Sequence, residues 1–291
     1  MLTRLLAVAA VVAMLLATGG SIASATGTDV TTGAVHYHPV NPGYTAIKAA
    51  LDARGPQAPG GGSIVSSGST TSPAAGPSWQ GLGANGSSPS DATGAIGPTE
   101  YVELINEQIG VYDRGSLSLL SSNSEAGFTG FSSASGDGQI LWDPAANRYF
   151  IAMLNSVGSN SYDLLWGFSK GMSPSASASD WCTYHSNFGA YGTNQLPDYP
   201  KLGTTQNFLL IGVNHFTDSA SNWNYVGSDV AWVGKPAVGT ATVSTCPGAG
   251  TTGIRPTLKN ADGSDASTPV PGRQTIWEGR GYCPSRKFRF S

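Results

Sequence analysis

The sequence predicts an all-β protein. Only 11% of its 291 residues are charged, whereas about 25% is usual in globular domains. Thirty-nine glycines, with many serines and threonines, separate apolar runs of about four to eight residues, as in sheets built from short strands. No stretch shows the apolar spacing of a long amphipathic helix, which disfavours an α/β fold.

The low charge also argues against some functions. Fifteen basic and 18 acidic residues give a formal net charge of −3. Phosphate neutralisation in nucleic-acid binding needs clustered Lys and Arg, so no nucleic-acid partner is expected. A helical bundle is disfavoured because its usual Ala/Glu/Lys/Leu/Arg helix faces are missing.

Residues 1–25 are typical of a secretory signal peptide. Arg4 provides the positive start, Leu5 to Ala17 the apolar stretch, and Ala23-Ser24-Ala25 the small-residue site, so cleavage is expected after Ala25. The apolar stretch, about 13 residues long, is short for a membrane span. The alternative is a retained N-terminal membrane anchor. We expect a secreted, extracellular protein with no membrane span.

Two short regions follow. Residues 26–54 are expected to form a small segment with one helix, since apolar residues recur at helical spacing between Gly43 and Ala53. In this segment His36 and His38 would share one face of an extended chain, as a metal pair requires, although a surface strand or loop is the simpler interpretation. Residues 55–78 are a Gly/Ser/Pro-rich flexible linker.

An internal repeat in residues 79–272 favours one type of β architecture over the others. Asp91, Asp137 and Asp198 each open a unit that runs through an apolar strand, a polar turn and an aromatic-led strand to an asparagine. The aspartates are 46 and 61 residues apart, the second unit being lengthened by Ser173–Ser179. A period near 45 built from four short strands is typical of propeller blades. We therefore expect a partial, incomplete β-propeller of about three to four four-stranded blades. The expected strands are 101–105, 109–112, 117–120, 140–142, 149–154, 164–168, 208–213 and 226–233.

Three segments carry a resemblance to known proteins. They are Pro89 to Val102, the Trp142-Asp143-Pro144 hairpin with Asn147-Arg148-Tyr149, and Asp198-Tyr199-Pro200-Lys201-Leu202-Gly203. Here the chain resembles uncharacterised exported bacterial β-propeller proteins, over roughly residues 79–271. The resemblance implies a multi-bladed propeller and supplies no activity or catalytic residues. Such proteins continue with further blades, whereas the pattern here stops near Val270-Pro271-Gly272.

The repeated aspartates are the candidate chemical site. Equivalent positions of successive blades lie around one axis, so Asp91, Asp137 and Asp198 can converge near one face. Converging carboxylates serve glycoside hydrolysis as acid and base, or bind a hard cation such as calcium. The simpler interpretation is structural, because an aspartate before a turn accepts backbone N–H bonds. Recurrence in every blade favours that structural role.

Aromatic residues are the candidates for ligand binding. Aromatic faces stack on sugar rings and anchor protein interfaces, and the alternative is that these side chains form the core between blades. The candidates lie in the second and third repeats: Trp166, Trp181, Trp223 and Tyr225.

Three functions are weighed. The first is a secreted or cell-surface binding module for carbohydrate or protein, the second a glycan-active hydrolase or lyase that uses carboxylates near the propeller axis, and the third a structural surface component. No G-x-S-x-G, H-E-x-x-H or Walker motif points to an enzyme, so the binding module is favoured. Gly81 to Gly86 matches G-x-G-x-x-G, but it follows a linker instead of a strand and is interpreted as a glycine loop.

The cysteines suit an oxidising compartment. One disulfide and one free thiol is the simplest arrangement of Cys182, Cys246 and Cys283. The pair Cys182–Cys246 is favoured because Cys283 lies in an irregular tail. That tail, residues 273–291, carries five basic residues and one acidic residue, and we expect it to be a truncated or frame-shifted end.

Overall fold

The computed structural model describes residues 78–83, 85, 89–219, 222–260 and 262–273. These residues form an all-β protein, as predicted, with one short α-helix, α3 (Glu125–Thr129), and one 3-10 turn, η1 (Ala178–Asp180). The strands are β1 (Thr93–Ile96), β2 (Glu100–Ile105), β3 (Gln108–Asp113), β4 (Leu119–Ser124), β5 (Gln139–Asp143), β6 (Arg148–Gly158), β7 (Ser161–Ser169), β8 (Trp181–Ser186), β9 (Gly192–Thr193), β10 (Gln195–Thr204), β11 (Phe208–Ser219), β12 (Asn222–Gly234) and β13 (Thr252–Arg255).

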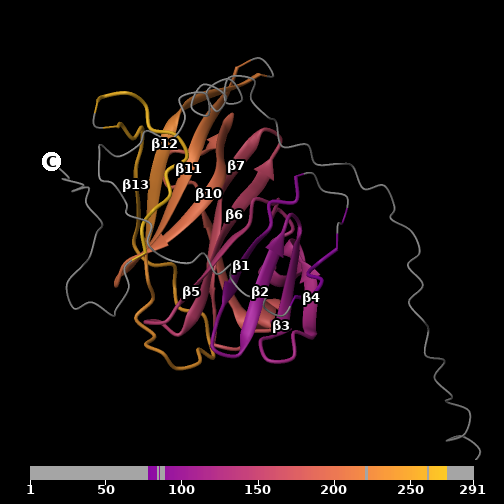
Figure 1. The fold of residues 1–291 in the computed structure, drawn as a ribbon. Coiled ribbons are helices and arrows are strands. Elements are labelled where there is room, and N and C mark those ends of the chain that lie inside the picture. Colours follow the sequence, from indigo (N-terminus) through magenta and orange to yellow (C-terminus); the bar gives the residue numbers. More distant parts are fainter. Residues whose placement is uncertain (1–77, 84, 86–88, 220–221, 261, 274–291) are drawn as a thin grey trace, which may run out of the picture. The chain divides into compact units, whose positions relative to one another are not determined.

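The strands form two antiparallel sheets (Figure 1). The smaller sheet contains β1, β2, β3 and β4 in chain order, and the larger has nine strands in the order β13-β12-β11-β10-β9-β7-β6-β5, with β8 paired to β7. Neither sheet is closed or curled, and no propeller is detected in the described part of the chain. The predicted fold class is therefore confirmed as all-β, and the predicted partial β-propeller is not confirmed.

The larger sheet contains two units of the same kind as the smaller one. Strands β5 to β8 pair as consecutive antiparallel neighbours, and strands β10 to β13 do the same. The two-residue strand β9 joins these units, because Gly192 pairs with Gln195 of β10 and with Tyr162 of β7. We call β1–β4, β5–β8 and β10–β13 the first, second and third meanders.

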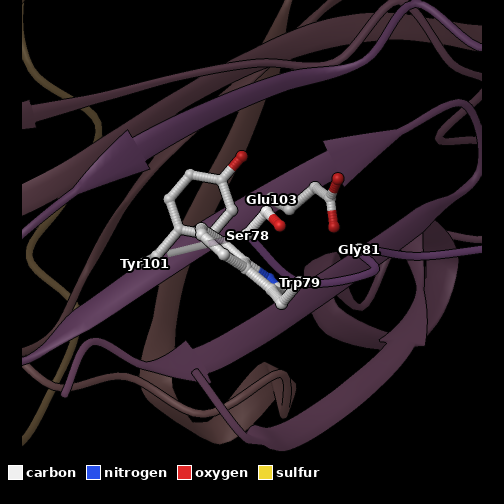
Figure 2. A pocket seen from close by; sticks show the side chains of 5 residues that line it. All are labelled: Ser78, Trp79, Gly81, Tyr101 and Glu103. Carbon is white, nitrogen blue, oxygen red and sulfur yellow. The ribbon is translucent and has the colours of Figure 1, made fainter. Parts of the chain in front are cut away.

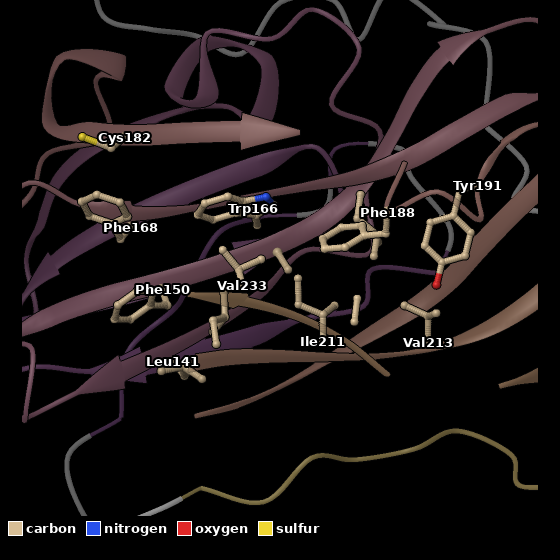
Figure 3. Close-up of a cluster of buried hydrophobic side chains, with 14 residues drawn as sticks. Leu141, Phe150, Trp166, Phe168, Cys182, Phe188, Tyr191, Ile211, Val213 and Val233 are labelled. Atoms are coloured by element: carbon tan, nitrogen blue, oxygen red, sulfur yellow. The ribbon is translucent and has the colours of Figure 1, made fainter. Parts of the chain in front are cut away.

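The second meander is buried on both faces, as β6 shows. Every side chain of β6 from 148 to 155 is buried. Phe150 belongs to an apolar cluster that the second meander shares with the third (Figure 3), whereas Tyr149 and Ile151 belong to a cluster shared with the first. Successive side chains of a strand point to opposite faces. The continuous apolar run of β6 therefore requires a packing partner on each side.

Several predicted regions lie outside the described residues. They are the signal peptide (1–25), the helical segment (26–54), residues 55–77 of the linker and the tail after Arg273, together with His36, His38 and Cys283. Within the part of the chain that is described, no helix has the length and apolar character needed to cross a membrane.

The predicted disulfide is confirmed. Cys182 of β8 is bonded to Cys246, 64 residues further along the chain. Cys182 is fully buried in the cluster between the second and third meanders. Nearby, the Tyr184 hydroxyl donates a hydrogen bond of 2.5 Å to the Pro247 carbonyl. The bridge therefore fastens the segment between β12 and β13 to the second meander.

Loss of this disulfide should destabilise the protein strongly. Closing a loop of this length restricts the unfolded chain, so the C182A/C246A double variant should lose about 4 kcal/mol of unfolding free energy. Urea unfolding of the full chain, followed by tryptophan fluorescence, measures the change. The C283A variant is the control and should keep wild-type stability. Equal losses in both variants would contradict the pairing.

Candidate functional site

The three aspartates of the repeat occupy comparable positions. Asp91 precedes β1, Asp137 precedes β5, and Asp198 lies in β10. The φ angles of Asp91 and Asp137 are 41° and 53°, and Tyr199, which follows Asp198, has a φ of 54°. Positive φ is unfavourable for residues other than glycine, so contacts around these residues must hold the backbone in place.

The three carboxyl groups converge. Burial raises the pKa of Asp198 well above its usual range, and the charge of Asp137, a hydrogen bond to the Asp137 carboxyl and the charge of Asp91 raise it further. A hydrogen bond between two carboxyl groups requires a shared proton, and burial favours its placement on Asp198. Burial lowers the pKa of Lys201, while the charges of the three aspartates oppose that shift. The positively charged Lys201 side chain is therefore close enough to the three aspartates to interact with their charges.

A buried asparagine, Asn106, connects two of these aspartates. Asn106 accepts the Asp137 N–H through Oδ1 at 2.8 Å and donates through Nδ2 to the Asp91 carboxylate at 3.0 Å. Asn214 of β11 makes a similar contact, because its Oδ1 accepts the N–H of Thr268 at 2.7 Å. Thr268 also has a positive φ, 46°. We call these two arrangements the asparagine joints.

These contacts favour the structural interpretation of the aspartates. The first asparagine joint links the end of β2 to the backbone of Asp137, which precedes the second meander, and the Asp91 carboxylate orients the Asn106 side chain that makes this link. None of the three aspartates lines either of the two hollows described below. Among the described residues, no group of three or more His, Cys, Asp or Glu side chains is arranged to hold a metal ion. Catalysis and calcium binding by these aspartates stay untested predictions.

The predicted aromatic residues lie in or against the apolar clusters. Trp166 and Trp181 are each 2% exposed. Trp166 stacks on Tyr184 with ring centroids 4.5 Å apart. Trp223 and Tyr225 are partly buried against a smaller cluster formed by Leu154, Leu196 and Phe216. The arrangement of all four corresponds to the core alternative considered for them.

An aromatic hollow lies on the first meander (Figure 2). Trp79 is 40% exposed, and its ring meets the Tyr101 ring edge-on with centroids 5.5 Å apart. Glu103 is held through Oε2, which accepts hydrogen bonds from the Leu82 N–H at 2.8 Å and the Tyr112 hydroxyl at 3.0 Å. The hollow has a volume of about 330 Å³ and is lined by Ser78, Trp79, Gly81, Tyr101 and Glu103.

A second hollow, of about 490 Å³, lies beside α3. Glu125 lines it and is 1% exposed. Burial raises the pKa of Glu125 to about 8, with further increases from the charges of Asp137 and Glu107, against the opposing effect of the Gly136 and Glu107 N–H groups. The Gly136 N–H donates to Oε2 at 2.8 Å. We call this the serine hollow, after its lining of Ser124, Ser132, Ser133, Ser135 and Ser156.

The sequence did not predict that the residues of either hollow form a candidate site. One usable signal exists for the aromatic hollow, because Tyr101 and Glu103 alternate in a predicted strand and so share a face, and Trp79 directly follows the linker. Glu125 has no such signal. It stands in a polar stretch between strands, and only the folded chain surrounds it.

Comparison with known proteins gives no relative, since no family model, curated protein or solved structure matches the chain.

Replacing a single atom in the first asparagine joint should lower the stability of the protein. In N106D an oxygen replaces the amide nitrogen that faces the Asp91 carboxylate, so a hydrogen bond becomes a repulsion. Loss of a buried polar contact of this kind costs about 3 kcal/mol of unfolding free energy. Urea unfolding measures the loss. The exposed Asn207 gives the matched control, N207D, which should change stability little, and equal stability of both variants would contradict the role of the joint.

Glu125 should make stability fall as the pH rises. Its pKa increases from about 4.5 to about 8 on folding, so the folded state binds more protons than the unfolded state between these values. Stability is therefore greatest below the lower value and declines toward the upper one. The E125Q variant keeps the shape without titrating, so it should lose less stability between about pH 5 and about pH 8.

Urea unfolding of the wild type and E125Q at both pH values measures this difference. The control is D265N, which alters an exposed carboxylate and should keep the wild-type slope. A slope for E125Q as steep as that of the wild type would contradict the assignment.

Proposed function

We propose that the chain is a secreted carbohydrate-binding module whose sugar site is the aromatic hollow. The observation that carries this proposal is the exposed Trp79 ring beside Tyr101 and the Glu103 carboxylate (Figure 2). Aromatic faces pack against the C–H faces of sugars, and a fixed carboxylate accepts hydrogen bonds from their hydroxyl groups.

The carboxylate of Glu103 is well placed for this role. Its Oε2 is occupied by two donors from the protein, which fix the side chain and leave Oε1 toward Gly81. A side chain at position 81 would collide with this group, since a Cβ there would lie 2.5 Å from Oε1. Glycine at position 81 therefore allows the chain to pack closely against the carboxylate. A small hollow with two aromatic rings and one acid suits a sugar ring better than a flat protein surface.

The proposal includes a partial β-propeller as scaffold, with the three meanders as successive blades. Three features support this. Each meander has four antiparallel strands in chain order, successive meanders share apolar clusters, and the asparagine joints repeat. Export is supported by the sequence of residues 1–25 and, weakly, by the disulfide. The hydrolase alternative gains no support, because the three aspartates line neither hollow.

Sugar binding should depend on Trp79. The full chain, screened on a glycan array and then titrated calorimetrically with the best glycan, should bind without hydrolysing it. The W79A variant should bind about tenfold more weakly, which corresponds to about 1.4 kcal/mol of lost stacking.

The matched control is F208A, because Phe208 is 38% exposed and lies on β11, outside the hollow. This variant should retain wild-type affinity. Absence of binding to any glycan, or equal losses in W79A and F208A, would refute the proposed site.

A further inference from the structure

A third aromatic ring adjoins the two that line the aromatic hollow. Tyr112 is buried, and its ring centroid lies 6.2 Å from that of Trp79 and 6.0 Å from that of Tyr101. Glu103 stands beside these rings, since the Tyr112 hydroxyl donates a hydrogen bond to its Oε2. The electron-rich face of an aromatic ring attracts a cation. Three rings together with a carboxylate therefore favour a positively charged ligand.

The charge of Glu103 is not balanced by a cation within the described residues. Its two hydrogen-bond donors, the Leu82 N–H and the Tyr112 hydroxyl, are neutral. None of the ion pairs in the described part of the chain includes Glu103, and the hollow has no Lys or Arg among its described lining residues. Burial, followed by the charge of Glu103, raises the pKa of Tyr101, so this charge acts on the neighbouring ring.

One oxygen of the Glu103 carboxylate can contact a ligand. Both hydrogen bonds that hold the side chain go to Oε2. In the described part of the chain no donor reaches Oε1, and this oxygen is not one of the buried polar atoms that lack a partner, so it retains exposed surface. Glu103 and the exposed Trp79 line the same hollow (Figure 2). A ligand that packs against the Trp79 ring can therefore donate a hydrogen bond to Oε1.

We propose that the aromatic hollow binds an amino sugar, with the protonated amine at Glu103 Oε1 and the sugar ring against Trp79. This inference rests on the function proposed above and narrows its ligand to a glycan with free amino groups. A primary ammonium group donates hydrogen bonds, as Oε1 requires, whereas a quaternary ammonium group has no N–H to donate. Hydrogen bonds between charged groups are stronger than those between neutral groups, so the amine, more than any hydroxyl group, decides which sugar binds.

The test compares a short glucosamine oligosaccharide with its N-acetylated form of the same length, both titrated calorimetrically into the full chain. The two sugars share their rings and linkages, and only the first carries positive charge. At a pH where the amines are protonated, the glucosamine form should bind about tenfold more tightly. Added salt should reduce this difference, because ions screen the attraction between exposed charges.

The E103Q variant assigns the preference to one side chain. Its carbonyl oxygen can keep the hydrogen bond from the Leu82 N–H, which places the NH₂ group where Oε1 stood. An NH₂ group accepts no hydrogen bond from an amine, so E103Q should bind both oligosaccharides with similar affinity. The control is D265N, which removes a negative charge at an exposed position outside the hollow and should keep the wild-type preference. The comparison of the two oligosaccharides on the wild-type chain needs no variant and stays decisive if E103Q does not fold.

Two results would overturn the amino-sugar inference and leave the carbohydrate-binding function intact. One is that the glucosamine form binds no more tightly than the N-acetylated form, while W79A weakens the binding of both. The other is that E103Q keeps the full preference for glucosamine. Absence of binding to every glycan would instead refute the function itself. A glycine-flanked lysine peptide that binds more tightly than the glucosamine form would assign the hollow to a protein partner and overturn both proposals.

Discussion

Burial of β6 on both faces is the constraint on which the arrangement of the meanders depends. A strand whose residues from 148 to 155 are all buried is stable only when both of its faces are covered, because each exposed face would return large apolar side chains to water. The first and third meanders therefore stabilise the second, and each in turn hides its own inner face against it. Arg148 strengthens this centre, since its buried guanidinium donates to the carbonyls of Ser169 and Gly239 at 3.1 and 3.3 Å.

Strands with a simple apolar pattern could be predicted from the sequence, and strands with a mixed pattern could not. The run 149–154 matches β6, because burial on both faces leaves a continuous apolar segment. By contrast β10 contains Pro197 and Pro200, which argue against a strand. The chain accommodates them with an irregularity in the pairing with β11 between Asp198 and Lys201. Whether the sheets close on themselves could not be predicted for another reason. Closure depends on contacts between units and not on the residue pattern within one unit.

The candidate sites also include features that could be predicted from the sequence and features that could not. The repeat predicted that the aspartates approach one another, and the interaction of Asp198 with Asp137 and Asp91 agrees with that geometry. The first asparagine joint could not be predicted in the same way, because Asn106 contacts Asp137 through a backbone N–H group that every residue except proline has. Aromatic residues at the centre of apolar runs, such as Trp166, become core. Trp79, by contrast, stands before the first strand, and its ring is 40% exposed.

A last feature of the third meander is its close contact with the segment Pro269 to Gly272. Gly203 and Gly212 face the chain at Pro269 to Gly272 so closely that a Cβ on either would lie 2.6 Å or less from its backbone. The Thr204 N–H also donates to the Gly272 carbonyl at 3.2 Å. This segment thus packs against β10 and β11 through contacts that leave no room for a side chain at either glycine. One added methyl group at either glycine would collide with this segment, so the attachment of residues 269–272 to the third meander depends on two positions that have no side chain.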